Sequence, residues 1–181
     1  MEKNDELFAL LESKDGKIRY NALNELIDIT DQPVEWVYDK WYELENKLSS
    51  DNSYQRSIGL MLLANLSKSD TDNRIGGIIT KITGFFEDEK FITSRQCIQF
   101  VWKIALNNKA NCNFIINELS KTYFENIHLK QHENIIKQDV IFSLCQISKF
   151  AEKSAYDKAV ELIGNENGTK LVKYLNTVLY K

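Results

Sequence analysis

Residues 19–29 read RYNALNELIDI, in which a basic residue, Arg19, is followed by small or apolar residues three, seven and ten positions later. The same pattern starts again at Arg56, Arg95 and Lys137, so successive copies begin 37, 39 and 42 residues apart. Positions with this spacing share one stripe of an α-helix, and a helical pattern with a period of about 40 residues is typical of stacked helix pairs. The residues at the three positions are Ala22, Leu26 and Ile29; Gly59, Leu63 and Leu66; Ile98, Trp102 and Ala105; and Val140, Leu144 and Ile147.

Turn-forming residues divide the rest of the chain into segments of helical length. Pro33 is the only proline, and no long stretch alternates apolar and polar residues as a strand would. The sequence therefore predicts an all-α fold, organised as a single domain over residues 1–181. Helices that carry the pattern are expected over about residues 17–29, 53–66, 91–106 and 133–150. Other helices are expected over about residues 5–12, 34–48, 111–126, 154–163 and 169–180, with one more that ends near residue 86 and is bent or closely packed at Gly76-Gly77.

Residues 15–22, DGKIRYNA, resemble the start of the second helix of a HEAT repeat, with its pattern D-x-x-[VI]-R-x-x-A. Asn52 with Arg56 is a weaker copy, and residues 88–98 are similar to a segment of small bacterial HEAT-repeat proteins. The resemblance extends from residue 15 to about residue 150. It implies a right-handed α-α superhelix of about four to five helix pairs, also called armadillo-like, in which the pattern-bearing helices form the inner, concave layer.

Charge is distributed unevenly along the chain. The formal net charge is −3, but residues 1–50 carry 6 basic and 12 acidic residues, whereas residues 51–181 carry 17 basic and 14 acidic ones. The overall balance gives no general attraction to nucleic acid or to an anionic membrane. An acidic first third could instead meet a basic surface on a partner.

Other sequence signals argue against secretion, a membrane span and a metal centre. The charged start has no apolar core of a signal peptide, and the longest largely apolar run, residues 58–66, is too short to cross a bilayer. The three cysteines form no CxxC pair, which favours a reducing, cytoplasmic location without disulfides. His128 and His132 have the i, i+4 spacing of a metal pair but lack a fixed third ligand, so neither a metal nor another cofactor is expected.

The repeated bases have two interpretations. Arg19, Arg56, Arg95 and Lys137 could form a ladder for phosphates, or each could bond to an acid such as Asp15 or to a neighbouring repeat. Fold-level repetition explains the residues fully, so we expect structural anchors. The fourth copy departs from the family pattern because it has a lysine where arginine is usual.

A column of apolar residues lies five positions after each anchor, away from the packing stripe. Its members are Met61, Phe100 and Phe142, with Asn24 in the first copy. Either the column lines a hydrophobic groove for a peptide or helix, or curvature and the C-terminal helices cover it. The candidate partner-binding residues on this face are Ile58, Met61, Cys97, Phe100, Ile104 and Phe142.

No nucleophile, phosphate loop or carboxylate pair can be placed, so we expect a non-enzymatic protein- or peptide-binding scaffold that uses its concave face. Two alternatives remain. One is a DNA-related function like that of the HEAT-like alkylated-DNA glycosylases, although nucleic acid is disfavoured because the predicted concave face is not basic. The other is a regulatory subunit of a larger complex.

Overall fold

A computed structural model describes residues 3–125 and 130–180, and in these ranges the protein is all-α, with no strand. No helix in the described ranges is long and apolar enough to cross a bilayer. The helices are α1 (Lys3–Leu10), α2 (Gly16–Ile29), α3 (Val37–Lys47), α4 (Ser53–Leu66), α5 (Arg74–Gly77), α6 (Ile79–Thr83), α7 (Phe91–Phe100), α8 (Trp102–Ala105), α9 (Lys109–Glu125), α10 (Glu133–Phe150), α11 (Ser154–Gly164) and α12 (Thr169–Leu179).

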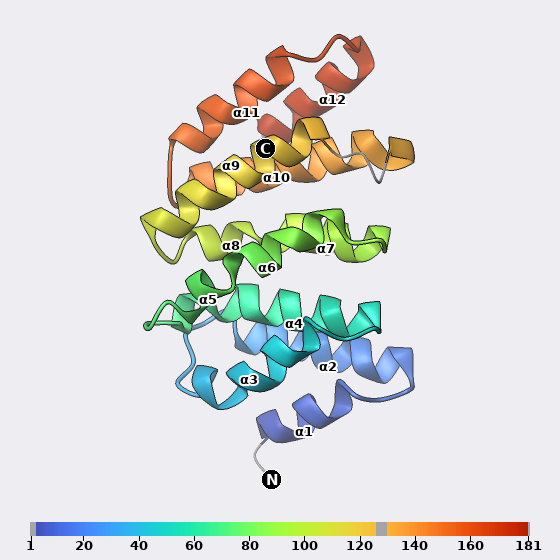
Figure 1. The fold of residues 1–181 in the computed structure, drawn as a ribbon, viewed down its shortest axis with the longest axis vertical. Helices are drawn as coiled ribbons and strands as arrows, with labels where there is room; N and C mark the ends of the chain where they lie inside the picture. The colour runs from blue at the N-terminus through green and yellow to red at the C-terminus, as the bar shows by residue number, and fades with distance from the viewer. Residues whose placement is uncertain (1–2, 126–129, 181) are drawn as a thin grey trace.

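The helices stack in chain order along the longest axis of the molecule, with the N-terminus at one end (Figure 1). The pattern-bearing helices contact one another in succession: α4 packs on α2 and on α7–α8, which in turn pack on α10. Each of them also packs against a helix that is its neighbour in the chain, as α1 does with α2, α3 with α4 and α9 with α10. The last two helices, α11 and α12, both contact α10.

The starts of α2 and α4 follow from their capping residues. Asp15 accepts hydrogen bonds from the backbone N–H groups of Lys17 (2.7 Å) and Ile18 (3.3 Å), and Asn52 accepts one from Tyr54 (3.0 Å). These side chains satisfy backbone donors that the first turn of a helix leaves free. Asp15, one of the predicted anchors, is therefore a helix cap and not an acid paired with Arg19.

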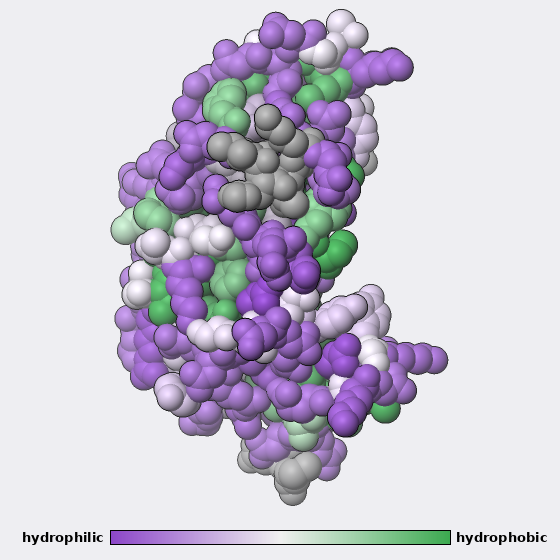
Figure 2. Space-filling model, turned by 45° about the vertical axis from the view of Figure 1, so that its right-hand side comes forward, coloured by the Kyte–Doolittle hydropathy of each residue, from purple (hydrophilic) through white to green (hydrophobic). Residues whose placement is uncertain are grey.

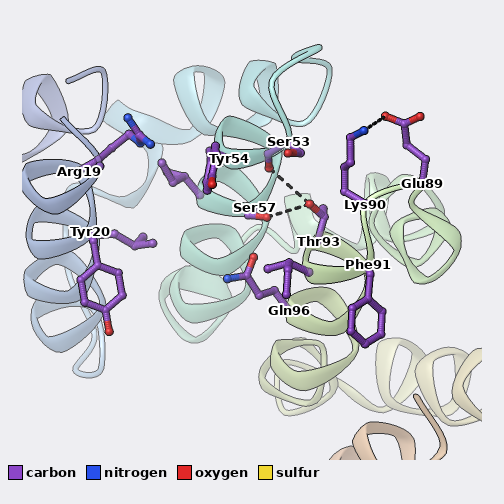
Figure 3. A pocket seen from close by; sticks show the side chains of 14 residues that line it. Arg19, Tyr20, Ser53, Tyr54, Ser57, Glu89, Lys90, Phe91, Thr93 and Gln96 are labelled. Carbon is purple, nitrogen blue, oxygen red and sulfur yellow. Dashed lines mark hydrogen bonds and ion pairs between the residues drawn. The ribbon is translucent and has the colours of Figure 1, made fainter. Parts of the chain in front are cut away.

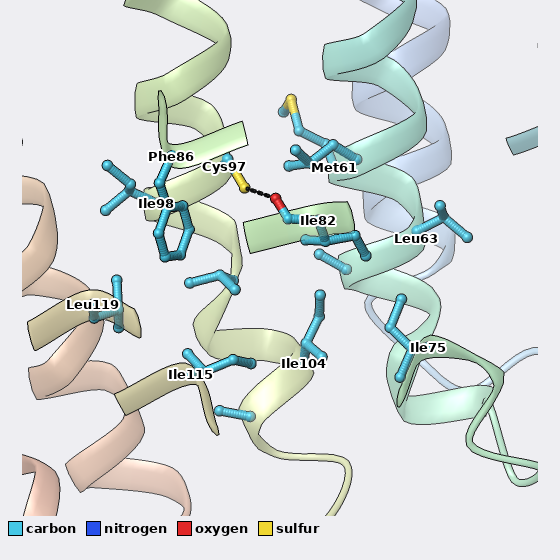
Figure 4. Close-up of a cluster of buried hydrophobic side chains, with 14 of the residues drawn as sticks. Met61, Leu63, Ile75, Ile82, Phe86, Cys97, Ile98, Ile104, Ile115 and Leu119 are labelled. Carbon is cyan, nitrogen blue, oxygen red and sulfur yellow. Dashed lines mark hydrogen bonds between the residues drawn. The ribbon is translucent and has the colours of Figure 1, made fainter. Parts of the chain in front are cut away.

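The repeated stripe forms the core. Leu26, Leu63, Ile98 and Leu144, seven or three positions after the anchors, are all fully buried, and they belong to one cluster that runs from Leu7 to Leu179. Figure 4 shows the middle of this cluster, where side chains of α4, α7 and α8 meet those of α6 and α9. The exceptions are Ile29 and Trp102, which are only half-buried.

Two of the expected helices are interrupted. The helix predicted to end near residue 86 is broken into α5, α6 and a 3₁₀ turn, with the break at Ile78 directly after Gly77. Asp70 caps its first turn by accepting from the N–H groups of Arg74 and Ile75 (3.0 and 2.8 Å). The helix predicted over 91–106 divides at Val101 into α7 and α8, where the N–H of Ile104 bonds the carbonyl of Val101 in a tighter turn.

Gly59 brings α3 and α4 unusually close together. A Cβ atom at this position would lie 2.7 Å from the carbonyl oxygen of Leu44 and 2.9 Å from Cβ of Lys47. Lys47 is itself fixed, because its ammonium group bonds Glu12 and the Gln55 side chain. The glycine is thus required by packing between the helices and not by an unusual backbone angle.

Candidate functional site

The basic anchors link neighbouring helices through ion pairs. Arg56 on α4 holds Asp88, just before α7, with two hydrogen bonds of 2.9 Å, and its third nitrogen donates to the carbonyls of Ser50 and Asp51. The Asp88 carboxylate is 5% exposed. The hydrogen bonds that Arg56 donates to Asp88 raise the pKa of Arg56 above its ordinary value. This anchor therefore joins two successive pattern-bearing helices from inside the stack.

The same arrangement recurs at the next two anchors. Arg95 on α7 makes two hydrogen bonds to Asp139 on α10, at 2.6 and 3.0 Å. Lys137 on α10 bonds Glu166, between α11 and α12, at 2.6 Å, and Glu133 at 2.7 Å. Burial acts to lower the pKa of Lys137, but its bonds to the two glutamates outweigh burial and raise it. Each of these three anchors thus bonds a carboxylate of the chain.

Arg19, the first anchor, differs from the other three. Its guanidinium group donates to the carbonyl of Ser13 (2.6 Å) and lies over the ring of Tyr54, 5.0 Å from the centroid. Within residues 3–125 and 130–180, no carboxylate pairs with it. Arg19 is thus the anchor whose charge remains available to a molecule outside the chain.

Most of the residues expected to bind a partner are in the core instead. Ile58, Met61, Cys97 and Ile104 are at most 8% exposed, so they form no exposed column, although Ile58 lies on the floor of a pocket described below. The reason is that α4 and α7 each pack on the pattern-bearing helix before them and on the one after them, which covers Met61 on α4 and Cys97 on α7. Only Phe100 and Phe142 of the predicted set reach the surface, with Phe142 38% exposed.

Phe100 and Phe142 line a pocket of about 630 Å³ between α7, α8, α10 and α12. Tyr174 and Val178 of α12 form one wall, so the C-terminal helix partly covers the column, which was one of the two expected outcomes. Burial lowers the pKa of Lys103 in this pocket, although the nearby Asp31 opposes the shift. Four polar side chains of the lining are already engaged within the chain: Arg95 and Gln99 both bond Asp139, and Lys103 bonds Asn65.

A second pocket, of about 590 Å³, lies where the N-terminal halves of α2, α4 and α7 come together (Figure 3). We call it the α2–α4–α7 pocket. These helix ends lie on the side of the molecule that Figure 2 brings forward, and the surface there is indented between green and pale residues. The residues that matter below are Arg19 and Tyr20 of α2, Tyr54 and Ile58 of α4, and Phe91 and Gln96 of α7.

The rim of the α2–α4–α7 pocket exposes large side chains. Tyr20 and Tyr54 are each 64% exposed and Ile92 is 58% exposed, whereas Leu23 and Ile58 form a buried floor. Aromatic side chains combine a large apolar area with few rotatable bonds, and they are enriched where proteins bind one another. The rim therefore has the composition of a contact surface.

Among the described residues, the charged side chains that line this pocket are two bases, Arg19 and Lys90, and one acid, Glu89. Lys90 and Glu89 at its edge pair with each other at 3.4 Å, so the charge of Arg19 is not cancelled by the other ionised side chains of the lining. The N-terminal ends of α2, α4 and α7 all face this side. Helix N-termini carry partial positive charge, but carboxylates accept from backbone N–H groups at two of these ends, Asp15 at α2 and Asp88 before α7. No side chain caps α7 at Lys90.

Gln96 leaves an unused hydrogen-bond acceptor in the pocket lining. Its Oε1 atom is buried and has no partner among the described residues. In Figure 3 the Gln96 side chain reaches from α7 toward α4. The two hydroxyl groups beside it are bonded to each other, Ser57 Oγ to Thr93 Oγ1 at 3.1 Å. Because nearly all buried polar atoms in proteins are paired, this acceptor is suited to a donor on a ligand once the Gln96 side chain turns its Oε1 atom into the pocket.

The histidines and cysteines form no second site in the part of the chain that the structure describes. His128 lies outside the described residues, and His132 stacks on Phe91 with 3.8 Å between ring centroids. No group of three metal-ligating side chains occurs within residues 3–125 and 130–180. Cys97, Cys112 and Cys145 are unpaired, and burial raises the pKa of each, that of Cys145 to about 11.

The cysteine environments predict slow alkylation of the native protein. A thiol reacts as its thiolate, and raising its pKa from an ordinary value of about 8.5 to about 11 lowers the thiolate fraction near neutral pH by at least about 100-fold. We expect iodoacetamide to label the folded protein at least that much more slowly than the urea-unfolded protein, with a rate that rises as pH increases. Intact-mass spectrometry measures both rates. Equal labelling of the two forms would contradict the buried placement.

Sequence reasoning missed the partners of the anchors and the tyrosine rim. Asp88 lies seven residues before Arg95, whereas Asp139 lies two residues after Lys137. The acids that pair with the anchors therefore occupy no fixed position in the repeat. Tyr20 and Tyr54 occupy different positions relative to Arg19 and Arg56. No model of a known protein family and no curated protein matches the chain in sequence.

Proposed function

We propose that the chain is a HEAT-like, right-handed helical solenoid of four to five helix pairs that acts as a non-enzymatic scaffold. It binds a peptide segment of a partner protein in the α2–α4–α7 pocket. The single observation that carries the proposal is this pocket, with its exposed tyrosines and an anchor arginine that no acid of the chain neutralises. The fourfold sequence pattern and the stacking of α2, α4, α7–α8 and α10 support the solenoid.

The dimensions of the pocket favour an extended peptide. Helices packed side by side are about 8–10 Å apart, so three successive helices span about 16–20 Å. An extended chain advances about 3.3 Å per residue, so five or six residues cross the pocket. A single small metabolite would occupy only part of this length.

The state of the basic anchors favours a protein partner over nucleic acid. Phosphate backbones are bound by cations that have no partner within the protein. Arg56, Arg95 and Lys137 are paired with carboxylates of the chain. Within the described part of the chain, Arg19 alone of the four anchors is left to bind a phosphate, whereas binding a DNA backbone needs several such bases. The hydroxyl groups of Ser57 and Thr93 bond each other, which leaves neither aligned with a catalytic base.

A selection from random peptides displayed on phage tests the proposal. We expect enriched peptides that bind the wild-type protein and bind the double variant Tyr20→Ser/Tyr54→Ser about 30-fold more weakly, the usual loss when central aromatic contacts are removed. The matched control is Tyr42→Ser/Tyr180→Ser, two tyrosines that are each 76% exposed and lie outside the pocket. Failure to enrich any peptide, or equal binding to both double variants, would contradict the proposal.

A further inference from the structure

We infer that the α2–α4–α7 pocket selects an acidic peptide segment, in which a glutamate or aspartate carboxylate pairs with Arg19 and an N–H group bonds Oε1 of Gln96. This inference rests on the proposed function and specifies the chemistry of the partner. It is drawn from three features of the pocket: a cation without an acid, an apolar and aromatic middle, and an orphaned acceptor.

The first step comes from comparing the anchors with one another. Each of the other three anchor bases is satisfied by a carboxylate from the next element of the stack, and two of them are held by paired hydrogen bonds of 2.6–3.0 Å. Arg19 makes one hydrogen bond, to a neutral carbonyl, and its remaining donors have no partner in the described ranges. A guanidinium group binds a carboxylate through two parallel hydrogen bonds. A carboxylate of the ligand would therefore pair with Arg19 in the way that Asp88 pairs with Arg56.

The second step concerns the aromatic and apolar middle of the pocket, between Arg19 and Gln96. Arg19 already covers the face of Tyr54, which leaves that ring less suited to receive a cation from a ligand. Leu23 and Ile58 form an apolar floor beside it. An apolar side chain next to the ligand carboxylate fits this part of the pocket, whereas a lysine or arginine would meet the charge of Arg19 at close range.

The third step concerns Gln96 on the far side of the pocket. An acceptor with no partner is satisfied by an N–H donor, and every peptide bond except that before proline supplies one. Figure 3 places Arg19 on α2 and Gln96 on α7, with α4 between them. The carboxylate and the N–H group of the ligand are therefore separated by no more than about six residues of extended chain, because the three helices span about 20 Å.

The acidic first third of the chain does not oppose this selection. The pocket lining contains two bases, Arg19 and Lys90, and one acid, Glu89, which is paired with Lys90. Asp15, the acid nearest to Arg19 in sequence, accepts from the backbone of Lys17 and Ile18 and caps α2. Screening over about 8 Å at physiological salt further limits the influence of acids on other faces.

Immobilised hexapeptide arrays, probed with the labelled full-length protein, test the inference. In these arrays one position is fixed as Glu, Gln or Lys and the other positions are mixtures. We expect the Glu arrays to give the strongest signal. In calorimetry, changing that Glu to Gln in the best peptide should weaken binding about 10-fold, because a charge-assisted contact is lost. This comparison leaves the protein unaltered, so misfolding cannot produce the result.

Variants of the protein complete the test. With Arg19→Gln, the Glu and Gln peptides should bind equally, because their difference depends on the arginine. The matched control is Arg74→Gln, which removes an arginine that also lies over a tyrosine, Tyr38, at 4.1 Å, but outside the pocket. That variant should keep the 10-fold preference.

The outcomes separate the inference from the proposed function. Peptides that depend on Tyr20 and Tyr54 but bind equally with Glu, Gln or Lys would overturn the acidic selectivity and leave the scaffold function standing. A preference for Lys, or a Glu preference that persists in Arg19→Gln, would also overturn the inference. Absence of any binding that depends on these tyrosines would overturn both.

Discussion

Replacing Gly59 with alanine is expected to lower the free energy of unfolding by about 2 kcal/mol, the range found for overpacked cores. In an ordinary helix interior the same change raises stability by about 1 kcal/mol, because alanine is the better helix former. Here the new methyl group would lie 2.7 Å from the carbonyl oxygen of Leu44, a backbone atom that cannot turn aside. Displacing α3 would also disturb Lys47 and its bonds to Glu12 and Gln55.

Urea denaturation followed by circular dichroism measures this effect. The matched control is Gly77→Ala, because Gly77 is also helical and a Cβ atom there would meet nothing within 4 Å. The control should leave stability unchanged or raise it. If both variants were stabilised, the close approach of α3 and α4 would be wrong.

Replacing Arg56 with alanine is expected to cost about 3 kcal/mol, because removing one partner of a buried ion pair leaves the other charge uncompensated. The Asp88 carboxylate would retain a hydrogen bond from the N–H of Lys90 but lose both bonds from the guanidinium group. Asp88 is 5% exposed, so water cannot fully replace the lost donors. The carbonyls of Ser50 and Asp51 would lose a donor as well.

The control for this prediction is Lys158→Ala. Lys158 and Glu161 form an exposed pair on α11 at 2.6 Å, and removing an exposed pair of this kind costs less than about 1 kcal/mol. Thermal and urea unfolding of both variants give the comparison. Equal losses for Arg56 and Lys158 would mean that the Arg56–Asp88 pair contributes no more than a surface ion pair.

The sequence pattern located most of the core because the spacing of apolar residues decides which side of a helix faces its neighbours. Leu26, Leu63 and Leu144 are buried as their positions predict, since apolar residues three to four positions apart must face the same neighbour. The break at Ile78 was harder to foresee. A glycine pair lowers helix propensity, but whether the helix bends or ends depends on the side chains it packs against.

The burial of most candidate partner-binding residues could not be predicted, for a different reason. Met61 belongs to the predicted column and Cys97 lies beside that column on its helix, but helices stacked above and below cover both, and one sequence does not say how closely layers approach. Arg19 was correctly grouped with Arg56 and Arg95 as a repeated base. Its distinction from them depends on acids distant in sequence, such as Asp88 and Asp139, which only the folded chain brings into place.

The difference between Arg19 and Arg56 also bears on how rigidly the two walls of the pocket are held. The pocket crosses two helix boundaries, and the one between α4 and α7 is fixed by the paired hydrogen bonds of Arg56 to Asp88. At the boundary between α2 and α4, Arg19 instead meets the flat face of Tyr54, a contact that tolerates sliding. At the pocket, one wall is therefore held by paired hydrogen bonds and the other by a ring contact, whereas at the far end of α2 the Asn65 side chain of α4 bonds the carbonyl of Ile27 and the hydroxyl of Thr30. We expect any adjustment of the pocket to be confined to the N-terminal end of α2.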